Sequence, residues 1–203
     1  KKMLCIWVSQ GKKLSMVALL FLRVNEIDEP LIMSVFRKAK ELRDLDALNN
    51  IIRSLAQIIT AENKKMLSVI LCAIQELTLL KNTWWIGYIW SKAEQLFNEL
   101  NEQEWDIILN NLILLPHINF ESEEILSILA WKYPEKFVEY FARRISVKKR
   151  RQSGNNYDAI PFNFAPRQTD KLLKLTDQHK RVIIDEIFKW FENKHWLNYW
   201  EGA

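Results

Sequence analysis

Apolar residues recur at three- and four-residue intervals along nearly the whole chain. This is the period of an α-helix with one buried face, and it differs from the alternation of a half-buried strand. The pattern predicts helices with inward faces over residues 31–42, 48–59, 66–77, 85–100 and 105–112, a short helix from Ser122, helices over 134–145, near 169–176 and over 178–192, and a further start at Trp196. An all-α protein is therefore expected.

Helix-start signals agree with this pattern. A proline in the first helical turn and a side chain that accepts from the first free N–H groups both mark helix starts. Asn101 and Glu104 have the spacing of a capping box, and Pro116 closes the helix that follows. The other start signals are Pro30, Asp44 or Asp46, Thr83, Ser122 and Pro134.

The starts of these helices are regularly spaced. First members of successive pairs begin near residues 44, 83 and 122, and second members near 62, 101 and 133. A two-helix unit that recurs at about 40 residues resembles HEAT-type repeats, in which each pair buries its apolar face on its neighbours. We therefore predict an α-solenoid of stacked antiparallel helix pairs, although the Asp and Arg ladder of such repeats is not evident. An irregular helical bundle is the alternative.

Composition limits the remaining possibilities. The chain has 203 residues, 49% of them hydrophobic, with 4 Gly and 5 Pro. This favours a single helical-repeat domain over residues 1–203, and the abrupt ends suggest a piece of a longer polypeptide. Cys5 and Cys72 lie in apolar runs, which predicts buried thiols in a reducing cytoplasm. The apolar run over residues 14–22 is shorter than the roughly 18 residues that span a bilayer, so no membrane contact is expected.

Charge is distributed in bands. Residues 93–131 contain 8 acidic and no basic residues, whereas residues 132–151 contain 8 basic and 2 acidic residues. Such bands are usually solvated helix faces, and the alternative is a polarised docking surface.

The basic band ends in a dense run of cations. Such a run can neutralise phosphates of a nucleic acid, but at a helix end it also complements the partial negative charge of the helix C-terminus. The candidates for nucleic-acid or partner contact are Arg143, Arg144, Lys148, Lys149, Arg150 and Arg151. Any binding to nucleic acid is expected to be weak, because the neighbouring acidic band repels a polyanion.

A long loop is predicted over residues 148–167, and its two halves differ in character. Gly154, Asn155 and Asn156 are expected to form a hinge between them. Its second half contains large apolar groups that are costly to leave in water. We expect this half to pack along the helices as an extended strap made by Tyr157, Ile160, Pro161, Phe162 and Phe164.

The stretch KNTWWIGYIW is rich in aromatic residues. Its lysine and paired tryptophans resemble a stretch of the HEAT-like DNA alkylation repair glycosylases, which place a carboxylate beside aromatic residues. In this chain the first acidic residue after the paired tryptophans is Glu94, which argues against glycosylase activity. Trp85 and Ile89 share a helix face and are expected in the core, which leaves Trp84, Tyr88 and Trp90 as candidates for a binding surface.

Catalytic motifs are absent from the sequence. The three histidines are far apart, and no metal-ligand spacing, nucleophile motif or glycine-rich phosphate loop occurs. We expect a protein that is not an enzyme and that uses neither metal nor cofactor.

The stretch LAWKYPEKFVEYFARRI and the later YDAIPF resemble the helical-repeat tails of large multidomain bacterial proteins, among them signal-transduction NTPases of the defence type. The resemblance covers about residues 128–164. It implies a cytoplasmic sensor or scaffold module that contacts a protein partner or other domains of its own chain. A nucleic-acid-binding repeat domain that uses residues 143–151 is the alternative.

Overall fold

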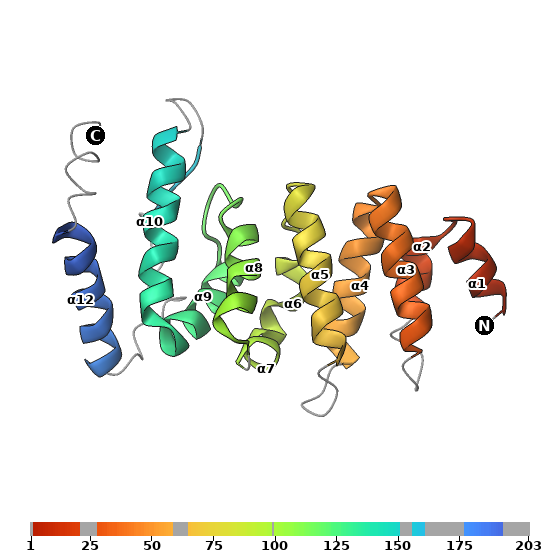
Figure 1. Ribbon diagram of the computed structural model, residues 1–203, viewed down its shortest axis with the longest axis horizontal. Coiled ribbons are helices and arrows are strands. Elements are labelled where there is room, and N and C mark those ends of the chain that lie inside the picture. The colour runs from red at the N-terminus through yellow and green to blue at the C-terminus, as the bar shows by residue number, and fades with distance from the viewer. Residues whose placement is uncertain are drawn as a thin grey trace. The chain divides into compact units, whose positions relative to one another are not determined.

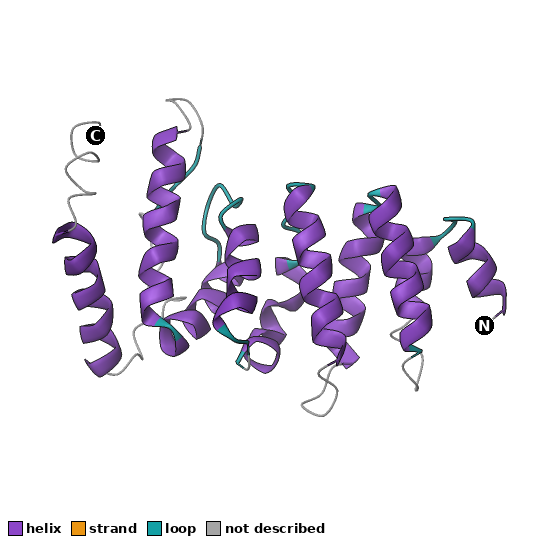
Figure 2. Cartoon of the chain, in the orientation of Figure 1, coloured by secondary structure: helices purple, strands orange, loops and turns teal. Residues whose placement is uncertain are grey.

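The computed structural model describes residues 2–20, 28–58, 65–98, 100–150, 156–160 and 177–192. Every regular element in these ranges is a helix, as Figure 2 shows, so the predicted all-α class is confirmed. The chain divides into two compact units, Lys1–Leu114 and Leu115–Ala203, where the sequence suggested one.

The first unit contains most of the helices. They are α1 (Lys2–Ser9), α2 (Leu14–Leu20), α3 (Glu29–Leu42), α4 (Leu45–Ile58), α5 (Lys65–Leu79), α6 (Ile86–Ile89), the 3₁₀ turn η2 (Trp90–Lys92), α7 (Ala93–Phe97) and α8 (Glu102–Leu112). Each packs on helices that are near it in the chain: α4 contacts α2, α3, α5 and α6, and α5 contacts α8 (Figure 1).

Several predicted helix boundaries are confirmed in this unit. Pro30 lies in the first turn of α3, and the Asp44 carboxylate accepts from the Ala47 N–H at 2.9 Å. Asn101 and Glu104 form the predicted capping box of α8, with backbone-to-side-chain bonds of 2.9 and 3.0 Å. These caps satisfy N–H groups that the helix itself leaves unpaired.

The predicted continuous helix over residues 85–100 is wrong. Three short pieces, α6, η2 and α7, stand in its place. The Gly87 and Tyr88 N–H groups donate to the carbonyls of Trp84 and Trp85, three residues earlier, which is the tighter 3₁₀ pattern. Gly87 also lowers helix propensity in the middle of the segment. The break leaves Trp84 in a turn before α6.

The second unit contains three described helices, α9 (Phe120–Lys132), α10 (Pro134–Arg150) and α12 (Asp177–Glu192), which all contact one another. Pro134 begins α10 as predicted, but the helix continues to Arg150 and so takes in the first residues of the expected 148–167 loop. The N-cap of α9 is Asn119 and not Ser122. Ser122 is the third helical residue, and its side chain completes a capping box with Asn119. The predicted helices near 169–176 and from Trp196 lie outside the described residues.

Two further expectations about burial are wrong. Cys5 and Cys72 are both exposed, because each points away from the packed face of its helix. Leu42, predicted inward, is exposed, and Ile32 lies in the core with Val35, Phe36 and Ala39 instead. Within the described residues, no helix combines the length and the apolar character that crossing a bilayer requires.

Candidate functional site

The turn between α5 and α6 displays two of the predicted surface aromatics. Helix α5 ends where Lys81 takes a left-handed conformation, with φ of 54°. The Asn82 and Lys81 N–H groups donate back to the carbonyls of Leu77 and Thr78 at 2.8 and 3.1 Å, which is the Schellman arrangement. The chain then turns sharply and presents Trp84.

A buried network of asparagines holds this turn. The Asn82 carboxamide oxygen accepts from the Trp84 N–H and from the Asn49 side chain of α4, both at 3.1 Å. The Asn111 side chain of α8 donates to the Asn82 carbonyl at 3.0 Å and to Thr78 Oγ1 at 2.9 Å. All three asparagines are buried, so their hydrogen bonds are shielded from water. The network ties the turn to α4 and α8.

Trp85 faces inward from the same turn. It is fully buried, as predicted, and its indole N–H donates to Asn111 Oδ1 at 2.7 Å. Its ring meets Phe97 edge-on, with 6.4 Å between centroids, and Phe97 meets Trp105 at 5.8 Å. Trp85 is therefore a structural residue that anchors the turn, and Ile89 is buried beside it in α6.

The opposite side of the turn is open to solvent. We call the exposed residues Trp84, Gly87, Tyr88, Ser91 and Lys92, together with Arg53 of α4, the aromatic face. Trp84 comes from the turn, Gly87 and Tyr88 from α6, and Ser91 and Lys92 from η2. Trp84 is 60% exposed and Tyr88 40%, whereas Trp90 is partly buried and does not belong to this face.

Arg53 completes the aromatic face. Its guanidinium carbon lies 5.4 Å from the centroid of the Tyr88 ring, within the range of a cation–π contact. Sequence reasoning missed Arg53, because it lies 28 positions before the aromatic stretch begins. It also gave no role to the three asparagines, because side chains that bond across helices leave no local signal. Packing of α4 on α6 brings Arg53 to Tyr88.

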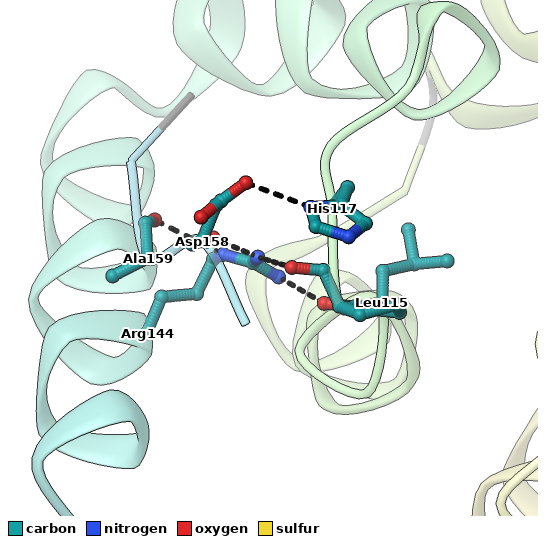
Figure 3. Close-up of polar contacts among 6 residues, drawn as sticks. Leu115, His117, Arg144, Asp158 and Ala159 are labelled. Carbon is teal, nitrogen blue, oxygen red and sulfur yellow. Dashed lines mark hydrogen bonds and ion pairs between the residues drawn. The ribbon is translucent and has the colours of Figure 1, made fainter. Parts of the chain in front are cut away.

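In the second unit, Arg144 does not lie on the surface, which corrects its place among the candidate binding cations. It is fully buried, and its guanidinium donates to the carbonyls of Leu115, Pro116, Asp158 and Ala159, as Figure 3 shows in part. The Tyr140 hydroxyl accepts a further bond at 3.4 Å. A buried guanidinium needs many acceptors to offset its lost hydration, and main-chain carbonyls supply them here.

Arg144 thereby holds the described part of the strap, residues 156–160. Its guanidinium carbon lies 4.5 Å from the centroid of Tyr157, which is buried as predicted. The Asp158 N–H donates to the Pro116 carbonyl at 2.8 Å, and its carboxylate pairs with His117 Nδ1 at 2.7 Å. Ile160 is exposed, contrary to expectation. Pro161, Phe162 and Phe164 lie outside the described residues.

The other candidate cations are at the end of α10. Arg143 is partly buried and Lys148 is exposed. Lys149 and Arg150 belong to α10, but their side chains lie outside the described part, as does Arg151. The exposed basic surface that the structure describes is therefore smaller than the sequence run.

Three groups among the described residues of this unit have shifted pKa values. The hydrogen bond and charge of Glu186 raise the pKa of Lys189. Burial raises the pKa of Tyr140 to about 12, against the opposing effect of the Arg144 charge. Burial, with a smaller contribution from the Glu124 carboxylate, raises the pKa of Glu123. Among the described residues, no three His, Cys, Asp or Glu side chains are grouped so that they could hold a metal ion.

Comparisons with known proteins identify no relative of this chain: no family model, no curated protein and no solved structure matches it.

Proposed function

We propose that this chain is a protein-interaction module, a sensor or scaffold part of a larger bacterial protein acting in the cytoplasm, with helix pairs stacked as an α-solenoid. Support for the solenoid comes from the first unit, where helices pack on those that are near them in the chain. The bacterial context rests on the resemblance of residues 128–164. The proposal assigns no reaction to the chain.

The observation that carries the proposal is the aromatic face. Trp, Tyr and Arg are the residues most enriched among those that dominate protein–protein binding energy. Arg53 lies over the Tyr88 ring, Trp84 is four residues before Tyr88, and all three are exposed. Covering the exposed part of Trp84 would contribute on the order of 3 kcal/mol, from the area of an indole ring and the usual free energy per unit of apolar area.

The support beneath this face strengthens the argument. The Trp84 N–H is held by Asn82, whose own side chain and carbonyl are held by Asn49 and Asn111. A side chain displayed on a rigid backbone loses less conformational entropy on binding than one on a loose loop.

Selection of a random displayed-peptide library on the whole chain tests the proposal. We expect enriched peptides whose binding weakens at least about tenfold in Trp84→Ala, as for a residue at the centre of an interface. The matched control is Trp131→Ala, which removes an exposed tryptophan from the second unit. The proposal is wrong if no peptide is enriched, or if both substitutions weaken binding equally.

Nucleic-acid binding through the end of α10 is the second candidate, and the exposure of Lys148 favours it. Because Arg144 is buried, fewer cations are available for phosphates than the sequence run suggests. We expect weak binding to DNA or RNA whose affinity falls with salt and that is lost on reversal of Lys148, Lys149, Arg150 and Arg151 to glutamate. Sub-micromolar binding at physiological ionic strength would place this function first.

A further inference from the structure

We propose that the aromatic face takes an acidic segment of a partner protein, with one apolar side chain of that segment seated over Gly87 between Trp84 and Tyr88. This inference rests on the proposed interaction function and adds to it the chemistry of the partner. It follows from three features of the face: its shape at Gly87, its charge, and the state of its cations.

Gly87 leaves open space at the centre of the face. Apart from its two chain neighbours and the backbone of its own helix, a Cβ built on Gly87 would meet no atom within 4 Å, so the space above Gly87 is open. Trp84 comes three residues before Gly87 and Tyr88 directly after it, and both side chains are exposed. An apolar side chain of a partner can rest on the Gly87 backbone and contact both rings, which buries apolar area on each side.

The charge of the face is positive. Arg53 and Lys92 are both exposed, and within the described residues no carboxylate forms an ion pair with either. Asp46, at the start of α4, lies two helical turns before Arg53. Glu76 of α5 is already paired with Lys40 at 2.5 Å. Two exposed cations that no described carboxylate pairs with are complementary to carboxylates of a partner.

Arg53 is suited to receive a carboxylate. Its position over the Tyr88 ring keeps the guanidinium beside the aromatic surface instead of leaving it to sample many rotamers. The planar group can stack on the ring and still donate two parallel hydrogen bonds from its edge. A segment with an acidic residue next to an apolar one therefore meets both features at once.

A single-stranded nucleic acid also uses aromatic rings and cations, but a different arrangement of them. It needs a groove of cations that follows the phosphates over several nucleotides. Here only two cations belong to the face, Arg53 over the Tyr88 ring and Lys92 in η2, and Asp46 lies on the same helix as Arg53. These observations favour an acidic peptide, and oligothymidylate serves as the competing probe.

The test uses the displayed-peptide selection on the whole chain, followed by synthesis of the most enriched peptide. We expect the enriched sequences to contain more Asp and Glu than the starting library, next to an apolar residue. Replacing the acids of the synthetic peptide by their amides should weaken binding about tenfold, and Arg53→Gln should weaken it to a similar degree. Arg37→Gln is the matched control, because Arg37 is an exposed arginine of α3 and gives the same change in net charge.

The outcomes separate the two proposals. Enriched peptides that need Trp84 but show no excess of acids, or that bind Arg53→Gln and wild type equally, overturn the acidic partner and leave the interaction function standing. Absence of any enriched peptide overturns both. Tighter binding of oligothymidylate than of the peptide, lost in Trp84→Ala, identifies a nucleic acid as the occupant. Self-association of the wild type that Trp84→Ala abolishes identifies a second copy, and either result overturns the proposal.

Discussion

Two buried tryptophans on either side of Phe97 offer a matched test of the asparagine network. Trp85 and Trp105 are both fully buried and both meet the Phe97 ring edge-on. Their indole N–H groups differ. That of Trp85 donates to Asn111 Oδ1 at 2.7 Å, whereas that of Trp105 is buried and finds no acceptor among the described residues. Replacing each tryptophan by phenylalanine therefore removes the same volume from the core. The Trp85 replacement breaks a buried hydrogen bond, whereas the Trp105 replacement removes an unsatisfied donor.

The expected magnitudes follow from this difference. Trp85→Phe leaves Asn111 Oδ1 buried without its donor, which costs about 1–3 kcal/mol beyond the cavity. The Asn111 carboxamide cannot simply flip, because its nitrogen already donates to Asn82 and Thr78. Trp105→Phe removes a donor that was unsatisfied and so loses only the cavity part. We expect Trp85→Phe to lower the free energy of unfolding by about 2 kcal/mol more than Trp105→Phe does.

Equilibrium unfolding in urea measures both substitutions, and an unchanged denaturant slope supports comparison of the midpoints. A double-mutant cycle of Trp85→Phe with Asn111→Ala should give a coupling free energy of about 1–3 kcal/mol. Equal costs for the two tryptophans, together with a coupling below about 0.5 kcal/mol, would refute the account of the network.

Three further predictions concern the second unit. The pKa of Tyr140 is raised from 10.0 to about 12, so the stability that this shift contributes is complete below pH 10 and is lost as the pH rises to about 12. The loss amounts to about 3 kcal/mol in the free energy of unfolding. Tyr140→Phe should remove this pH dependence between pH 10 and 12, as measured by unfolding at several pH values. The pKa of Glu123 is also raised, so its ionised form opposes folding at pH 7; Glu123→Gln should raise the thermal midpoint at pH 7, and the difference should vanish below pH 4.5. Arg144→Lys should lower the free energy of unfolding by about 3 kcal/mol or more, because an ammonium group cannot reach four carbonyls. Hydrogen exchange at the Asp158 amide should accelerate in this variant. Lys148→Gln, at an exposed position, should change neither quantity.

The parts of the fold that could be predicted are those encoded by local sequence. Helical periodicity found most of the helices, although α1 and α2 were not among those predicted. The capping box of Asn101 and Glu104 found a helix start, because both signals act within one or two turns. Trp85 could be placed in the core because it shares a helix face with Ile89. The break at residues 85–100 was missed, because apolar spacing alone does not separate a 3₁₀ turn from a continuing α-helix.

The candidate site could be predicted only in part. Trp84 and Tyr88 were found from an aromatic-rich stretch, but Arg53 reaches Tyr88 only through packing of α4 on α6. Arg144 was misassigned for a related reason. A run of cations indicates an exposed surface on average, and nothing in the run distinguishes the one arginine that turns inward toward carbonyls 14 and 29 residues away.

The asparagine network links the stability of the first unit to what its surface can bind. Asn111 holds both the indole of Trp85 and the carbonyl of Asn82, and Asn82 in turn holds the backbone of Trp84. A change at buried Asn111 therefore loosens an exposed ring that it does not touch. Because a loosened ring must be ordered again when a partner binds, part of the binding free energy is lost without any change in the contacts made. The rigidity of the aromatic face is thus a property of the core beneath it, and a substitution in that core should weaken peptide binding even where the chain remains folded.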